Sequence, residues 1–88
     1  MDLSVEISMY PLQDGYKEKI KAFLDDINAS DYPVEIRSSN MSTRIFGSFE
    51  DVTSLLNSAM HQSMARFGKI VFVCKYLEGD ARTLKNYD

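Results

Sequence analysis

Residues 5–12, VEISMYPL, alternate between apolar and polar side chains. In an extended chain, successive side chains point to opposite faces, so the two kinds separate. One face would carry Val5, Ile7 and Met9, and the other Glu6, Ser8 and Tyr10. The pattern predicts a strand with one face in a hydrophobic core. Its second face is either exposed to solvent or part of a binding surface.

Two segments instead show the spacing of an amphipathic helix. The first runs from Tyr16 to about Asn28, and Asp14 is a plausible N-cap for it. The second begins after Ser48, where Asp51 completes a weaker form of the capping box, and Gly68 ends it.

Three further strands are expected at residues 33–39, 42–47 and 69–77, the last being rich in β-branched and aromatic residues. The order βαββαβ predicts an α+β, ferredoxin-like fold, in which two helices pack on one face of a four-stranded antiparallel sheet. Residues 1–80 are expected to form a single domain. Residues 81–88 are expected to be a polar, loosely held C-terminal tail.

In this arrangement the helices cover one sheet face and leave the other open. The residues expected to meet the helices are Val5, Ile7, Met9, Val34, Ile36, Ile45, Ile70, Phe72, Cys74 and Tyr76. The residues expected on the open face are Glu6, Ser8, Tyr10, Glu35, Arg37, Arg44, Phe46, Val71, Val73, Lys75 and Leu77. A face that met only water would be more uniformly polar.

The apolar residues of this open face predict a homodimer packed sheet against sheet, with a homotetramer as a further step. Such a small domain also gains stability from association. The polar residues of the face would then be either a rim with internal ion pairs or the lining of a cavity, because unmatched polar groups are costly inside an interface.

Composition excludes several function classes. The 88 residues carry a net charge of −3, which argues against a general nucleic-acid binder. With one cysteine and one histidine, Cys74 and His61, neither a cysteine-based metal site nor a nucleophile with a histidine base can be assembled. We therefore expect no enzyme activity, no metal and no cofactor. No apolar run would span a bilayer and no signal peptide is present, so we expect a cytoplasmic protein without membrane association.

Three blocks of the sequence together resemble a known family. EISMYPL at 6–12, NMSTRIFGSFEDV at 40–52 and KIVFVCKYLEGD at 69–80 are similar, in order, to the signature blocks of the YkoF-like thiamine- and hydroxymethylpyrimidine-binding proteins. The resemblance implies a ferredoxin-like fold and pairing of two such units through their open sheet faces. It also implies non-catalytic binding of the pyrimidine moiety of thiamine near those sheets, for thiamine precursor salvage or trafficking.

The same resemblance points to particular ligand-binding residues. Ser8, Tyr10, Ser42 and Thr43 match the family blocks, and Glu6 is a candidate hydrogen-bond acceptor. Hydroxyls, a carboxylate and an aromatic face suit an aminopyrimidine. The last strand departs from a polar ligand lining, since its open face reads Val71, Val73, Lys75. The alternative function is an oligomeric interaction or regulatory module, whose open face serves assembly only.

Overall fold

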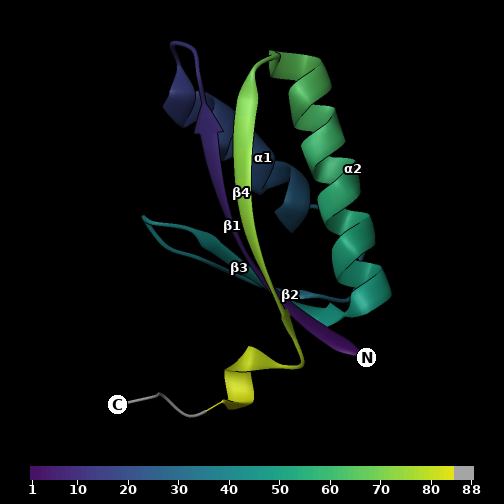
Figure 1. Cartoon of the computed structure of the whole chain (residues 1–88). Helices are drawn as coiled ribbons and strands as arrows, with labels where there is room; N and C mark the ends of the chain where they lie inside the picture. The colour runs from purple at the N-terminus through teal and green to yellow at the C-terminus, as the bar shows by residue number, and fades with distance from the viewer. Residues whose placement is uncertain (85–88) are drawn as a thin grey trace.

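The computed structural model describes residues 1–84, which form a layer of helices packed against one β-sheet (Figure 1). The predicted order βαββαβ is confirmed, with a short 3₁₀ turn added after the last strand. The elements are β1 (Asp2–Pro11), α1 (Tyr16–Asn28), β2 (Glu35–Ser38), β3 (Thr43–Ser48), α2 (Phe49–Phe67), β4 (Ile70–Glu78) and the turn η1 (Ala81–Thr83).

The four strands form one antiparallel sheet in the order β2-β3-β1-β4. The first strand therefore lies inside the sheet, between β3 and the last strand β4. Both helices cover the same face of the sheet, as Figure 1 shows. The predicted ferredoxin-like fold is confirmed.

The core lies between the sheet and the helices. Its fully or almost fully buried apolar residues come from β1, β3 and both helices: Leu3, Val5, Ile7, Phe23, Ile27, Ile45, Val52, Leu55, Leu56 and Ala59. Val5 pairs with Ile45 on one side and with Tyr76 on the other, so all three share the helix-facing side. Tyr76 nevertheless keeps 55% of its surface exposed, so it belongs to the predicted face without being a core residue.

The ends of the elements confirm some predictions and correct others. Ser48 caps α2, accepting a hydrogen bond from the backbone N–H of Asp51 at 3.1 Å, and Gly68 ends that helix with a positive φ of 88°. The predicted N-cap of α1 is wrong. Gly15 occupies that position in the left-handed region, at φ 76°, and its neighbour Asp14 supplies no side-chain cap. Strand β1 also begins earlier than predicted, at Asp2.

Part of the expected tail is packed onto the domain. Ser4 Oγ donates to the carbonyl of Gly79 at 2.9 Å and accepts from the N–H of Ala81 at 2.8 Å. These bonds hold the start of η1 beside β1. Residues 81–84 are therefore attached to the domain, whereas a loosely held tail was expected there. The remainder of the expected tail, residues 85–88, lies outside the described residues.

This turn changes one end of the open face. Phe46 was expected to lie bare there, yet only 5% of it is exposed. The guanidinium groups of Arg37 and Arg82 each lie 5.3 Å from its ring centre. Val71, Val73 and Leu77 do remain exposed, at 44%, 50% and 46%. The sheet face is therefore open along β4 and closed over Phe46.

Candidate functional site

The sheet lacks one corner. Strand β3 pairs with β1 only from Asp2 to Ile7, whereas β4 pairs with β1 as far as Pro11. Residues 8–11 consequently have a paired strand on one side only. The β2–β3 hairpin turns away from β1 at this point (Figure 1), and α1 passes beneath the gap.

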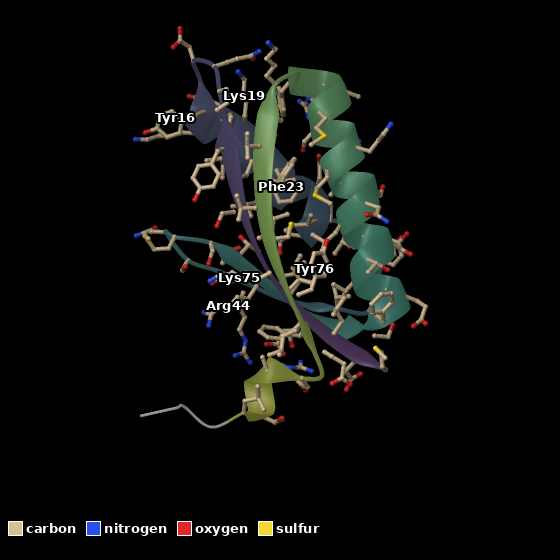
Figure 2. The ribbon with its side chains drawn as sticks, in the orientation of Figure 1. Tyr16, Lys19, Phe23, Arg44, Lys75 and Tyr76 are labelled. Carbon is tan, nitrogen blue, oxygen red and sulfur yellow. The ribbon has the colours of Figure 1, made fainter. Side chains whose placement is uncertain are left out.

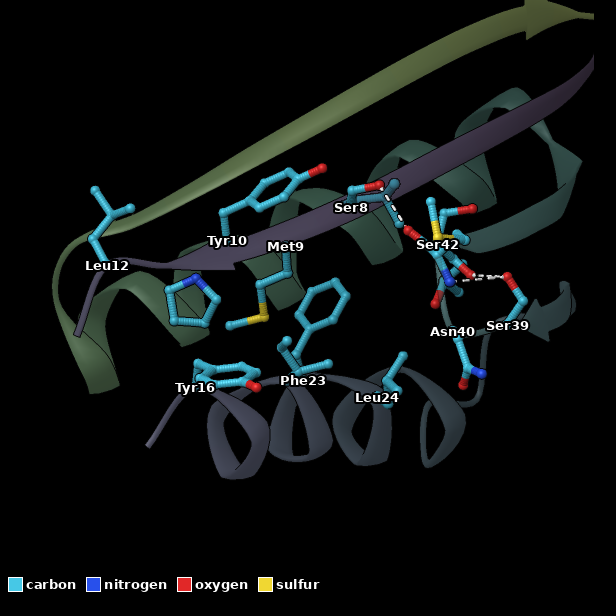
Figure 3. A pocket seen from close by; sticks show the side chains of 15 residues that line it. Ser8, Met9, Tyr10, Leu12, Tyr16, Phe23, Leu24, Ser39, Asn40 and Ser42 are labelled. Carbon is cyan, nitrogen blue, oxygen red and sulfur yellow. Dashed lines mark hydrogen bonds between the residues drawn. The ribbon is translucent and has the colours of Figure 1, made fainter. Parts of the chain in front are cut away.

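A cavity of about 430 Å³ fills the missing corner. This volume lies in the range of about 300–1,000 Å³ that is usual for small-molecule sites. Figure 3 shows Met9 and Phe23 between β1 and α1, with Tyr16 at the start of the helix. These side chains give the cavity an apolar wall with aromatic faces.

The opposite wall is the turn between β2 and β3, which brings polar groups. Ser39 fixes this turn: its N–H donates to the carbonyl of Ser42 at 2.9 Å, and its Oγ donates to the same carbonyl at 3.2 Å. Ser8 Oγ reaches across from β1 to the carbonyl of Met41 at 3.4 Å. Asn40 also borders the cavity (Figure 3). The rim thus offers hydroxyls and an amide next to the aromatic wall.

Ser42 is oriented by a carboxylate. Its Oγ donates to Glu6 Oε2 at 2.9 Å, and the other oxygen of Glu6 lies 3.5 Å from Lys75 Nζ. Because its proton is directed to Glu6, the Ser42 hydroxyl has lone pairs left for a donor on a ligand. An exocyclic amino group is such a donor.

The structure brings four of the five predicted site residues to this cavity. Ser8, Tyr10, Ser42 and Thr43 line it, and Glu6 contacts it only through Ser42. Thr43 pairs with Ile7 on the helix-facing side, is 5% exposed, and lies 3.1 Å from the hydroxyl of Ser38. Residues from both faces of the sheet therefore line the cavity, which lies at the edge of the sheet beside the open face.

Several lining residues were not among the predicted site residues. Tyr16, Phe23 and Leu24 lie in the helix predicted from Tyr16 to about Asn28, and Met9 was expected only to meet the helices. The sequence offered one signal, since Tyr16 is aromatic and begins the predicted helix. In the structure it stands at the first position of α1 and is 53% exposed. An aromatic residue at the start of an amphipathic helix can serve a site at the sheet edge as well as the core.

None of the described residues that line the cavity carries a formal charge. Among residues 1–84, no group of three or more His, Cys, Asp and Glu side chains is placed to hold a metal. Cys74 lies on β4, facing the helices, and burial raises the pKa of its thiol. Activated cysteines show the opposite direction. The described lining of the cavity therefore offers aromatic faces, hydroxyls and an amide.

Comparison with known proteins places the chain in a family. The model of the YKOF-related family matches residues 3–78. The chain belongs to the YKOF-related family. No functionally curated protein is significantly similar to it.

Solved structures similar to this YKOF-related protein share its fold. A Streptococcus pneumoniae protein, SP2199, superposes with a TM-score of 0.75 at 19% identity, covering 96% of this chain and 93% of its own. TM0486 from Thermotoga maritima, provisionally assigned to thiamine biosynthesis or salvage, gives a TM-score of 0.74 at 14% identity, covering 86% and 82%. A Bacillus cereus domain of unknown function gives 0.70 at 14% identity, covering 92% and 79%.

No helix among residues 1–84 is both long and apolar enough to cross a membrane.

Proposed function

We propose that this protein binds hydroxymethylpyrimidine, or thiamine through its pyrimidine ring, in the cavity at the end of β1. Binding is non-catalytic and serves thiamine precursor salvage or trafficking. Membership of the YKOF-related family and the similarity to TM0486 support a thiamine-related role. The observation that carries the proposal is the uncharged cavity between Tyr16 and Ser42.

The chemistry of the cavity fits an aminopyrimidine. The flat ring stacks between the aromatic and thioether side chains of Tyr16, Phe23 and Met9. The exocyclic amino group donates to Ser42 Oγ, whose proton is already given to Glu6. Ring nitrogens accept from hydroxyl or amide groups of the rim, which include Ser8 and Asn40.

We also propose that the protein forms a homodimer through its open sheet face. Exposed Val71, Val73 and Leu77 form the apolar part of this face along β4. Burying these side chains fully would contribute roughly 5–9 kcal/mol before the entropy cost of association. Because Tyr10 also lies on this face, opposite Val71, the partner would cover one side of the cavity entrance.

The alternative is that the open face serves assembly alone, as an interaction or regulatory module. The exposure of the apolar side chains of β4 favours this candidate, since it needs no ligand.

Calorimetric titration with hydroxymethylpyrimidine, thiamine and thiamine phosphate tests the proposed ligand. We expect hydroxymethylpyrimidine and thiamine to bind. Tyr16→Ala should weaken binding about two- to tenfold through lost stacking. Ser42→Ala should weaken it by a similar factor, through the lost hydrogen bond.

Tyr32→Ala is the matched control, because Tyr32 is 39% exposed and does not line the cavity. Its affinity should equal that of the unchanged protein. If none of the three compounds gives heat at high protein concentration, the ligand-binding proposal fails and the assembly function replaces it. Binding that neither Tyr16→Ala nor Ser42→Ala weakens would show that the ligand occupies another site.

A further inference from the structure

The open sheet face carries a row of four charged residues, one from each strand. Arg37 of β2 pairs with Arg44 of β3, Arg44 with Glu6 of β1, and Glu6 with Lys75 of β4. Residues directly opposite each other lie on the same face, so the row crosses the whole sheet. In the view of Figure 2, Arg44 and Lys75 lie on the side of the strands away from α2.

The charges of this row are not balanced. Glu6 lies 3.5 Å from Lys75, and Glu35 pairs with Arg37 and Arg82. Within residues 1–84, Arg44 makes neither an ion pair nor a side-chain hydrogen bond, although its side chain is exposed. It stands directly opposite Arg37 on one side, where like charges are destabilising, and directly opposite Glu6 on the other, without forming an ion pair with it. An anion at this point would remove the repulsion.

A hollow of about 360 Å³ lies over the row. Its lining contains four cations, Arg37, Arg44, Lys75 and Arg82, and a single carboxylate among the described residues, Glu6. The chain as a whole has a net charge of −3, so this concentration of cations is local.

Two of these guanidinium groups are held in place before any ligand arrives. Arg37 and Arg82 both lie against Phe46, and Arg82 Nε donates to Asp80 Oδ1 at 2.8 Å. A fixed guanidinium loses less freedom when it binds an oxyanion, and its planar fork matches phosphate oxygens.

We propose that this hollow is an oxyanion site that binds a phosphate group, with Arg44 as the main ligand and Arg37 and Lys75 beside it. The group is either free phosphate or the phosphate of a small organic molecule. Among the described residues, this hollow and the proposed pyrimidine cavity share no lining residue. Glu6 connects them, through Ser42 on one side and Lys75 on the other.

Titration of the full chain with inorganic phosphate, followed by amide chemical shifts at constant ionic strength, tests the site. Saturable shifts should centre on residues 37, 44 and 75. Arg44→Gln should weaken binding at least about tenfold, because a charge-assisted hydrogen bond is lost. Arg44→Lys should retain part of the affinity, since it keeps the charge without the fork.

Arg66→Gln is the matched control, because Arg66 also lies over a phenylalanine ring, at 4.9 Å from Phe67, but on α2. It should leave phosphate binding unchanged. Tighter binding of phenyl phosphate than of inorganic phosphate would assign the site to an organic phosphate, and equal binding to the free ion.

Two results would overturn the proposal. The first is shifts that never saturate and are reproduced by chloride. The second is that Arg44→Gln loses self-association while the unchanged protein does not bind phosphate. Arg44 would then pair with a carboxylate of a second copy of the chain. Tyr16→Ala should not alter phosphate binding, so failure here is distinguishable from failure of the pyrimidine proposal.

Discussion

At the residue scale, Ser63 is a polar group in an apolar place. It lies on the core side of α2, is 1% exposed, and its Oγ has no hydrogen-bond partner among the described residues. A buried hydroxyl without a partner costs roughly 1–3 kcal/mol relative to a satisfied one. Ser63 is therefore a site where the sequence is not optimal for stability.

We predict that Ser63→Ala raises the free energy of unfolding by about 0.5–1.5 kcal/mol, because it removes the unpaired hydroxyl and alanine favours the helix. Urea denaturation measures the change. Ser58→Ala, on the exposed side of the same helix, is the control for helix propensity alone. A lower stability of Ser63→Ala than of Ser58→Ala would show that the hydroxyl has a partner.

Residue alternation could have placed Thr43 correctly. Thr43 and Ile45 are two positions apart on one strand, so they share a face, and Ile45 was predicted to meet the helices. The family resemblance instead grouped Thr43 with Ser8 and Tyr10 as ligand-binding residues. In the structure Thr43 both faces the helices and lines the cavity with Ser8 and Tyr10, because the cavity reaches past the sheet edge to the helix-facing side.

At the element scale, the turn η1 is attached by charged groups. Hydrogen bonds from Arg82 and then from Arg37 hold the pKa of Glu35 below its usual value. Hydrogen bonds from Arg82 likewise hold the pKa of Asp80 low, and the two carboxylates raise the pKa of Arg82. A carboxylate with a lowered folded pKa stabilises the fold above its unfolded pKa, and this contribution is lost as the pH falls through the folded value.

We predict that the turn is attached at neutral pH and loosens only in acid, as the pH falls through the lowered pKa values of Asp80 and Glu35. Carboxyl carbon shifts should titrate with midpoints below the ordinary values of aspartic and glutamic side chains, because Arg82 donates hydrogen bonds to both carboxylates. Arg82→Gln should raise both midpoints, whereas Arg66→Gln should raise neither. Midpoints at or above these reference values in the unchanged protein would contradict the pairing.

Local patterns predicted the helices and strands but not how far neighbouring strands run together. The signals for α2 are all local: Ser48, Asp51 and Gly68 mark its ends. The start of α1 was misassigned because Asp14 has the better capping side chain, while Gly15 has the backbone freedom that the turn uses. The cover over Phe46 joins residues far apart in the chain, and no periodicity encodes such a contact.

At the scale of the whole molecule, the open face has an apolar half along β4 and a charged middle. The cavity exists because β1 extends beyond the end of β3 and α1 closes the gap. Neither feature follows from one strand alone, since each depends on register between strands. The sequence could therefore predict which residues share a face, and it could not predict the missing corner.

We predict that the protein sediments as a dimer at tens of micromolar, and that Val73→Lys weakens self-association at least about tenfold by placing a charge in the interface. Analytical ultracentrifugation measures both. Met64→Lys is the control, because Met64 is similarly exposed, at 44%, but lies on α2. A monomeric unchanged protein would refute the sheet-to-sheet dimer.

The central place of β1 has a consequence for biosynthesis. The ribosome makes β1 first among the strands and β4 last, yet the two are direct neighbours. At about 5–20 residues per second, the nascent β1 waits roughly 3–12 s from Pro11 until Ile70 is added. Throughout that interval its β4 edge has no native partner, and an unpaired edge invites contact with other chains. Chaperone capture should thus be most valuable during translation, before the last strand closes the sheet.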